Sequence, residues 1–404
     1  MSLARVRATC LAALQNSDGS VALGPPSAFL QFVQGPLPAL SSHASAKGSG
    51  IDLPLVLDED EGIDATVLLC LLQFGSGFRE PLHEAVGCGA SDAMVRGVLG
   101  FLMVGRKPSA GLLAHLKEHE VADIWGLPMT IDEPVPDLPC VTMSKPGPLR
   151  PLVAHIARVL NACGRALLEA GAPSFAALFK AQASAWTGRA GKAEPCMDAF
   201  VDFLVERFPV AFRDVAFVPR QQAQGEEGAA GGGGGGGAAS GSAESGSNSS
   251  SSSTATTAPA PTAVEGGGEG GEQPLLEVWL LKKAQLCAKE LGRKFGASLP
   301  QLFGWAPGDV ASLTAFADNV LPCVLCAEGV LVVSEALGAK IEGGLEVEAR
   351  EAALLRAATV LACDALAAQG GVSAETLDNV LWHAGKLEQY RKLKRHINKA
   401  TSYY

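Results

Sequence analysis

Apolar positions between residues 313 and 327 recur at the spacing of an amphipathic helix, which predicts one face buried in a core. Pro322 lacks a backbone N–H and disfavours the helical conformation of the residue before it, so the helix should kink or restart there. Asp318 lies off the apolar stripe, close to this break. The stripe itself consists of Leu313, Phe316, Val320, Val324 and Ala327.

Asp318 has two interpretations. A carboxylate beside a helix break is commonly a cap or a solvated side chain, because Asp readily accepts hydrogen bonds from nearby backbone N–H groups. A carboxylate inside an otherwise apolar segment also suits a functional acid. The local pattern alone favours the cap or an exposed position.

The same periodicity predicts further helices, and strands do not alternate with turns anywhere along the chain. The prediction is therefore an all-α fold. Two short helices separated at residues 106–109 are expected between 92 and 129, and a Pro-rich extended segment at 132–151. Longer helices are predicted over residues 64–74, 152–168, 175–186, 197–208, 275–295, 346–368 and 376–383.

Residues 221–274 differ from the rest of the chain in composition. They contain a run of seven glycines, a Ser/Asn-rich run and the sequence GGGEGG. Such a segment has too little apolar surface to offset its chain entropy, so we expect a disordered low-complexity insertion. Residues 1–220 and 275–404 are then expected to form a single helical domain.

The formal net charge of −10 bears on the class of ligand. Polymeric nucleic acid is bound by broad basic surfaces, which this balance disfavours, whereas a single phosphate needs only one or two cations. The apolar runs near the C-terminus are interrupted by Glu328, Arg356 and Asp364, so no membrane span is expected. We therefore expect a small-molecule ligand, without direct binding of a polynucleotide or a membrane.

Ten cysteines in so long a chain, several of them within apolar helical patterns, are typical of buried free thiols. This favours a reducing compartment, and we predict a cytoplasmic protein, with organelle targeting left open by the N-terminal sequence. Two patterns resemble metal sites, namely His115 with His119 and Cys323 with Cys326. Each pair lacks the further ligands that a metal would need, so no metal is expected.

Eight short motifs occur in a fixed order along the chain, each weak by itself but specific in combination. The series resembles the queuosine salvage proteins, the queuosine 5′-phosphate N-glycosylase/hydrolase family, over nearly the whole chain apart from the insertion. The motifs are LLQFGSGF (71–78), FPVAFRD (208–214), LLKKAQL (280–286), LTAFADNVLP (313–322), EVEAR (346–350), LW (381–382), RH (395–396) and the terminal YY (403–404).

The resemblance implies a mostly helical enzyme, similar in outline to helix-hairpin-helix DNA glycosylases. It would hydrolyse the C–N bond of queuosine 5′-phosphate and release the base queuine for reinsertion into tRNA, without a cofactor. The family's catalytic Asp corresponds to Asp318, and the Lys at its substrate corresponds to Lys282.

The chemistry suits these residue types. Breaking an N-glycosidic bond builds positive charge on the sugar, which a fixed carboxylate stabilises. The leaving group is a 7-deazaguanine, with carbon in place of N7, so the proton must reach another atom of the base; its donor is not identified. We expect Lys282 to bind the phosphate. Further substrate-binding candidates are His396 and Tyr404 for the phosphate, Phe74 and Trp382 for base stacking, Glu348 for the queuine ammonium group, and Asn319.

One departure from the family affects base recognition. The family commonly has Asp-x-Leu-Asn-Phe where this chain has Cys70-Leu71-Leu72-Gln73-Phe74. An altered base preference, or a helix end that serves only for packing, would each explain the change. Two alternative functions also stay open, namely a non-catalytic helical interaction protein and a glycosylase that acts on polymeric nucleic acid.

Overall fold

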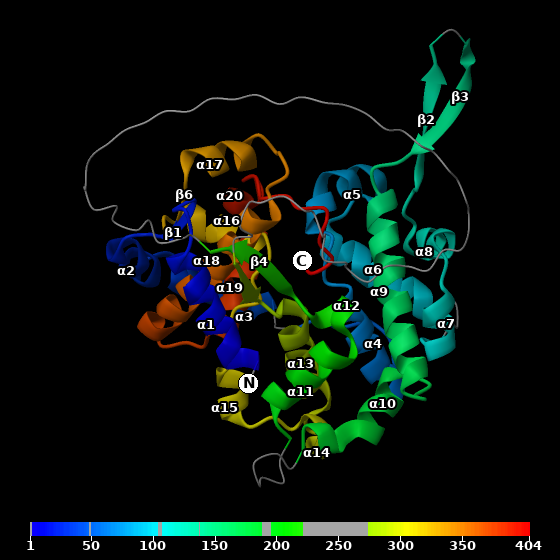
Figure 1. The fold of residues 1–404 in the computed structure, drawn as a ribbon, viewed down its shortest axis with the longest axis horizontal. Coiled ribbons are helices and arrows are strands. Elements are labelled where there is room, and N and C mark those ends of the chain that lie inside the picture. The colour runs from blue at the N-terminus through cyan, green and yellow to red at the C-terminus, as the bar shows by residue number, and fades with distance from the viewer. Residues whose placement is uncertain (1, 48–49, 104–106, 137, 188–194, 221–273) are drawn as a thin grey trace, which may run out of the picture. The chain divides into compact units, whose positions relative to one another are not determined.

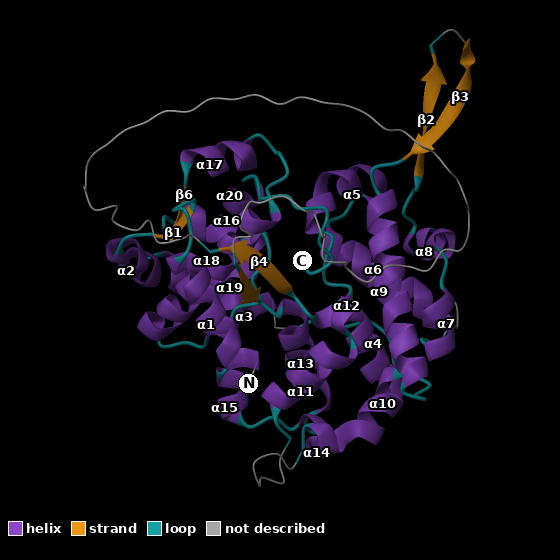
Figure 2. Cartoon of the chain, viewed as in Figure 1, coloured by secondary structure: helices purple, strands orange, loops and turns teal. Residues whose placement is uncertain are grey.

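The computed structural model describes residues 2–47, 50–103, 107–136, 138–187, 195–220 and 274–404. Residues 1–220 and 275–404 form one compact unit. The predicted insertion, apart from Pro274, lies outside the described residues. Helices dominate, and the strands form only three small two-stranded sheets, so the predicted all-α class is confirmed (Figure 2). The likeness to helix-hairpin-helix glycosylases stays a prediction.

Figure 1 shows the helices, coloured by their position in the chain. The N-terminal half contains α1 (Ser2–Gln15), α2 (Pro26–Gln34), α3 (Pro36–Lys47), α4 (Glu59–Leu71), η1 (Ser76–Phe78), α5 (Arg79–Val86), α6 (Ala90–Met103), α7 (Ala110–His115), α8 (Glu118–Trp125), α9 (Arg150–Glu169), α10 (Phe175–Gln182), η2 (Ala183–Ala185), α11 (Met197–Arg207) and α12 (Pro209–Phe212). The C-terminal part contains α13 (Lys282–Phe295), α14 (Pro300–Phe303), α15 (Pro307–Ala311), α16 (Val320–Ala327), α17 (Glu335–Glu342), α18 (Ala349–Gly370), α19 (Ala374–Ala384) and α20 (Glu388–Arg391).

All three sheets are antiparallel pairs. They are β1 (Val21–Leu23) with β6 (Leu331–Val333), β2 (Thr130–Val135) with β3 (Leu138–Pro146), and β4 (Val215–Pro219) with β5 (Leu275–Trp279). Pro219 pairs with Leu275, so the chain leaves the described residues and returns to them at adjacent positions of the same sheet.

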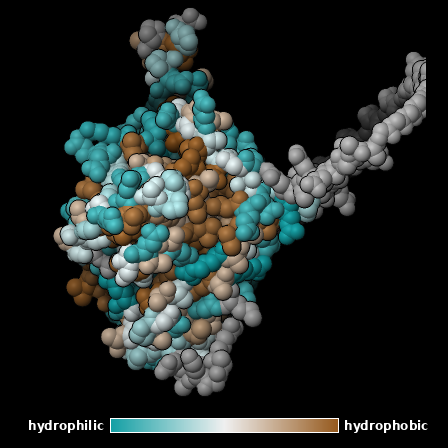
Figure 3. All heavy atoms as spheres, turned by 90° about the vertical axis from the view of Figure 1, so that its left-hand side faces the viewer, coloured by the Kyte–Doolittle hydropathy of each residue, from teal (hydrophilic) through white to brown (hydrophobic). Residues whose placement is uncertain are grey.

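The core is built around helices that are apolar on several faces. α18 packs against α1 and α19, while α13 packs against α4 and α11. α4 begins with a capping box between Asp58 and Glu61, and from Ile63 to Leu71 every residue is buried. Apolar side chains also reach the surface on the face carrying α2, β1 and β6, where Leu23, Leu30 and Val332 are exposed (Figure 3).

No single helix in the described ranges has the length and hydropathy of a membrane span. One bent pair, Ser76–Val86 with Ala90–Met103, passes the same test by length and composition.

The helix predicted over residues 313–327 is wrong in its first half. Residues 313–318 have no regular secondary structure, and α16 begins only at Val320. Side chains from elsewhere hold the backbone groups that a helix would have used: Gln285 binds Thr314 N, Asp378 binds Phe316 N, and Arg356 binds Ala317 O. Pro322 lies in the first turn of α16, where a missing N–H is tolerated, so the predicted kink is also wrong.

The helix predicted over residues 275–295 is also wrong in its first part, which is β5. Leu281 separates β5 from α13 with a left-handed backbone, φ 52°. Residues 90–125 form three helices rather than two, so His115 and His119 lie on different helices, α7 and α8. The extended segment after residue 130 forms the hairpin β2–β3.

Candidate active site

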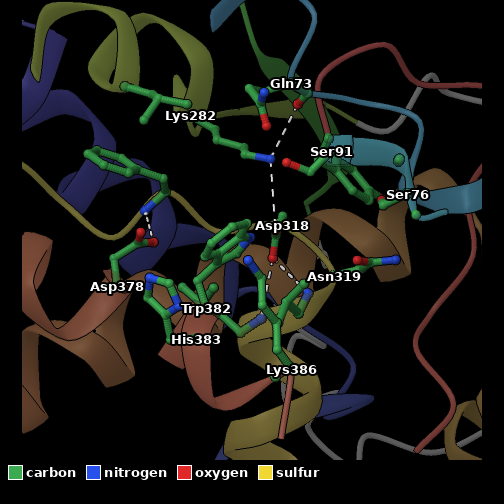
Figure 4. A pocket seen from close by; sticks show the side chains of 18 of the residues that line it. Gln73, Ser76, Ser91, Lys282, Asp318, Asn319, Asp378, Trp382, His383 and Lys386 are labelled. Carbon is green, nitrogen blue, oxygen red and sulfur yellow. Dashed lines mark hydrogen bonds and ion pairs between the residues drawn. The ribbon is translucent and has the colours of Figure 1, made fainter. Parts of the chain in front are cut away.

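A cavity of about 490 Å³ lies among four parts of the chain that are distant in sequence. These are residues between 47 and 92 on both sides of α4, residues 282–290 of α13, the segment 316–321, and residues 378–404. Figure 4 shows Lys282, Asp318, Gln73 and Trp382 around this space. Every part except the first lies in the C-terminal 131 residues.

Asp318 both caps a helix and lines the cavity, as the two interpretations of its sequence position separately suggested. Its Oδ1 accepts hydrogen bonds from Val320 N (2.7 Å) and Leu321 N (3.3 Å), so the side chain caps α16. Its Oδ2 lies 3.7 Å from Lys282 Nζ, in the cavity (Figure 4). The positive end of the helix dipole adds to the stabilisation of the carboxylate. Only 7% of the residue is exposed. The cap thus fixes the orientation of an acid that faces a cavity.

Lys282 also lines the cavity and is almost fully buried. Its Nζ donates to Gln73 O at 3.3 Å, in addition to its ion pair with Asp318. Burial lowers the pKa of Lys282, and the charge of Asp318 opposes that shift. The ammonium group of Lys282 therefore lies next to the carboxylate of Asp318.

Lys283, the next residue, points away from the cavity. Its Nζ donates to Leu71 O (2.9 Å) and to Ser402 O (2.7 Å), which ties α13 to the end of α4 and to the C-terminal tail. Burial lowers the pKa of Lys283 to about 7. Both lysine side chains are enclosed, although adjacent residues of a helix face different directions.

Two motifs hold the segment before Asp318 in place. The Gln285 amide bonds to Thr314 N (2.9 Å) and Thr314 Oγ1 (2.9 Å), and so joins the KKAQ motif to the LTAFAD motif. Arg356 Nε donates to Ala317 O at 2.8 Å. The residue beside the acid is therefore fixed by a side chain of α18.

Arg356 in turn pairs with Asp214 of the FPVAFRD motif, through both oxygens of that carboxylate. The backbone oxygen of Asp214 accepts from Leu280 N at 3.0 Å, two residues before Lys282. We refer to Asp214 and Arg356 as the sealed pair, since both are almost fully buried. It connects the turn that presents Lys282 with the segment that presents Asp318.

The other sequence-predicted residues divide into two groups. Phe74, Asn319, Trp382 and Tyr404 line the cavity, with Lys386 Nζ 3.4 Å from the centroid of the Trp382 indole. His396 lies behind Tyr404, with 5.6 Å between the ring centroids, and does not line the cavity.

Glu348 lies outside the cavity. Its side chain is 72% exposed and forms an ion pair with Lys340 at the start of α18. Because Glu348 is the exposed N-cap residue of α18 and does not line the cavity, its position does not support the expected contact with a ligand ammonium group.

The departures at Cys70 and Gln73 have different surroundings. Cys70 is fully buried within α4, whereas Gln73 lines the cavity. Any effect of the family difference on ligand recognition therefore depends on Gln73.

Sequence reasoning missed a group of polar atoms that converge on the cavity. Ten buried side-chain nitrogen or oxygen atoms of the described residues have no hydrogen-bond partner in the protein, and six of them line this cavity. Each such atom costs about 1–3 kcal/mol unless something binds it, so the cluster indicates a polar ligand. The six are Gln73 Nε2, Ser76 Oγ, Glu290 Oε1, Asn319 Oδ1, Arg395 Nε and Tyr404 OH.

Sequence reasoning also missed Asp378, although a signal was present. The tetrapeptide Asp-Asn-Val-Leu occurs at residues 318–321 and again at 378–381. Both aspartates line the cavity. Burial, and then the negative charge of Asp318, raise the pKa of Asp378 to about 7.

A second cavity, of about 560 Å³, lies between α9, α11 and α12. Its charged lining residues are balanced, namely Arg165 and Arg207 with Glu169 and Glu206. None of the buried polar atoms without a partner in the described residues belongs to it. The first cavity is therefore the candidate site.

Comparison with known protein families gives one match. Residues 274–404 match the family model described as queuosine salvage protein. The match includes Lys282, Asp318, Asp378, Trp382 and Tyr404, while Gln73 and Ser76 lie outside it. No curated protein matched the chain. The family match supports a role in queuosine salvage.

Proposed function

We propose, from the match of residues 274–404 to the queuosine salvage protein family model, that this chain hydrolyses the N-glycosidic bond of queuosine 5′-phosphate and releases queuine. One observation carries the proposal. Asp318 is fixed through Oδ1 by two backbone N–H groups, while Oδ2 faces a cavity beside Lys282.

A carboxylate held in this way suits the transition state of glycoside hydrolysis. As the C1′–N bond lengthens, positive charge develops on the sugar, and a fixed negative charge nearby stabilises it without reorganisation. The same carboxylate can orient a water molecule towards C1′. Because Oδ1 is already bound, Oδ2 is the oxygen available for either role.

The cavity also suits the size and charge of a nucleotide. Its volume of about 490 Å³ falls within the range of small-molecule sites. We propose that Lys282 contacts the phosphate side of the sugar, where Tyr404 also lines the cavity, and that Phe74 and Trp382 contact the base. Asn319, next to the acid, has a free amide oxygen for the sugar hydroxyls.

The experiment is a chromatographic assay of queuine released from queuosine 5′-phosphate. Asp318→Asn should lower kcat by at least about a hundredfold, in line with removal of one positioned charge. The amide oxygen can still accept from Val320 N and Leu321 N, so the cap should survive. Glu348→Gln, on the exposed end of α18, is the matched control and should keep wild-type turnover. Full activity of Asp318→Asn would refute the proposal.

The phosphate is tested separately with unphosphorylated queuosine. Turnover of the nucleoside should be much slower than that of the monophosphate, and Lys282→Met should reduce the difference. Equal rates on the two substrates with the wild-type enzyme would rule out the phosphate contact while leaving the hydrolase intact.

A further inference from the structure

Four carboxylate side chains line the cavity, and two of them, Asp318 and Asp378, differ in their surroundings. Asp318 has a cation at 3.7 Å and two backbone donors. Asp378, on α19, accepts one hydrogen bond through Oδ1, from Phe316 N at 2.8 Å. In the described residues no hydrogen bond or ion pair reaches its Oδ2. One oxygen of Asp378 is thus used for position, and the residue also lines the cavity; Figure 4 shows it beside His383.

The charged groups facing Asp378 come from every element around it. Lys289 and Lys282 lie on α13, and Asp318 lies in the segment before α16. On α18 the nearby titratable group is Cys363, and the end of α3, which packs against α19, contributes Lys47 to the cavity lining.

Lys282 and Lys289 of α13 each form an ion pair with another carboxylate. Lys289 forms an ion pair with Glu375, and Lys282 forms one with Asp318. A buried carboxylate without a cation of its own, next to a second carboxylate, favours its protonated form. Burial is the main cause that raises the pKa of Asp378 to about 7, and Asp318 adds to it. Burial and the charge of Asp318 thus favour a proton on Asp378, and a carboxyl group of raised pKa beside a second carboxylate is how acid and base roles are divided in glycosidases.

We propose that Asp378 is the general acid of this site, giving a proton to the base as it leaves. The inference rests on the proposed hydrolase function. It answers the need raised by a 7-deazaguanine leaving group, which has no N7 to accept a proton. Because both residues line one cavity, the Asp378 carboxyl group would lie beside the same substrate that Asp318 contacts.

The electron pair of the C1′–N bond goes to the base nitrogen, and the proton of Asp378 goes to the departing base. Water forms the new C1′–O bond, and its proton passes to Asp318 and then to solvent. Asp378 recovers a proton from solvent before the next turnover. The products are the neutral base and ribose 5-phosphate, with one water consumed.

The test compares two substrates with different leaving groups. The base of queuosine 5′-phosphate needs a proton in order to leave. In the second substrate, a ribose 5-phosphate that carries 4-nitrophenol at C1′, the leaving group departs as a stable 4-nitrophenolate anion. Asp378→Asn should lower kcat on the first substrate by about 10²–10⁴-fold and on the second by only a few-fold. Asp318→Asn should lower both, because each reaction builds charge on the sugar.

The pH profile supplies a readout that a merely structural residue would not change. Wild-type kcat on the nucleotide should fall above pH about 7 as Asp378 loses its proton, and this alkaline limb should be absent for the nitrophenyl substrate. Asp378→Asn keeps an oxygen for Phe316 N, and Asp378→Ser is a second variant with a hydrogen-bonding oxygen.

Three results separate the possibilities. Equal losses of Asp378→Asn on both substrates would overturn the acid role and point instead to positioning of the 316–318 segment. A raised KM for the nucleotide with unchanged kcat would also overturn it, and would indicate binding of the queuine ammonium group. A wild-type protein inactive on both substrates would refute the hydrolase itself.

Discussion

The sealed pair and the cavity both adjoin the segment that ends at Asp318, but the buried carboxylates in the two places have different partners. Asp214 is bound through both oxygens by Arg356 and is 2% exposed. Asp318 follows Ala317, whose backbone oxygen Arg356 also contacts, and it has one oxygen bound and one facing the cavity. Both are buried carboxylates in the same fold.

The neighbouring lysines repeat this difference. Lys283 donates to two backbone oxygens and holds the tail and α4 together, whereas Lys282 faces Asp318 across the cavity. Burial alone therefore does not distinguish a structural charge from a functional one. The distinguishing feature is incomplete pairing, and six buried polar atoms without partners lie on the cavity side.

Removing one member of the sealed pair should have the largest effect on stability. Arg356→Leu leaves Asp214 buried without its cation, so the free energy of unfolding should fall by about 3–5 kcal/mol, measured by denaturant titration. The double variant Asp214→Leu/Arg356→Leu should recover part of this loss. A loss below about 1 kcal/mol for Arg356→Leu would contradict the assignment of a sealed pair.

The adjacent lysines should separate activity from stability. Lys282→Met removes a cation from the substrate side, so kcat/KM should fall about ten- to a hundredfold with little change in unfolding. Lys283→Met leaves Leu71 O and Ser402 O without their donor, so stability should fall by about 1–3 kcal/mol. If both variants behaved alike in the two assays, the distinction between the two sides would be lost.

Shortening the insertion should leave both sides intact. Because Pro219 pairs with Leu275, residues 221–273 can be replaced by Asn-Gly to close a short hairpin. The shorter loop costs less closure entropy, so stability should rise by at most about 2 kcal/mol, with turnover unchanged. Lower turnover in this variant would assign the insertion a role at the site.

His396 should give a small pH-dependent effect. Burial, and then the charge of Arg356, lower its pKa to about 3, below the 6.5 of an unfolded chain. Between these values the unfolded chain binds the proton and the folded protein does not, so stability falls as pH falls below about 6.5.

Between pH 6.5 and 5 this group should account for about 1–2 kcal/mol of the loss, measured as the difference between wild type and His396→Asn in denaturant titrations. At pH 7.5 the pH dependence of the two proteins should be parallel. An identical acid dependence of both proteins would show that the His396 ring is accessible to protons in the folded state.

Much of the helical architecture was predictable because it depends on local periodicity. The helix predicted over 152–168 is α9 at Arg150–Glu169, and the one over 197–208 is α11 at Met197–Arg207. The errors occur where distant side chains replace the helical hydrogen bonds. The segment 313–318 has a helical pattern of apolar residues but forms no helix, because Gln285, Arg356 and Asp378 bind its backbone.

The sequence by itself determined the all-helical class, the motifs that carry the family resemblance, and the choice of Asp318 and Lys282 as candidates. Only the tertiary structure decided that Oδ2 of Asp318 faces a cavity and that Lys283 points away from it. It also brought Asp378, from a second Asp-Asn-Val-Leu sequence, into the same site. The reason is physical. Periodicity reports which face of an element is buried, whereas the partners of a buried polar atom come from residues far away in the chain.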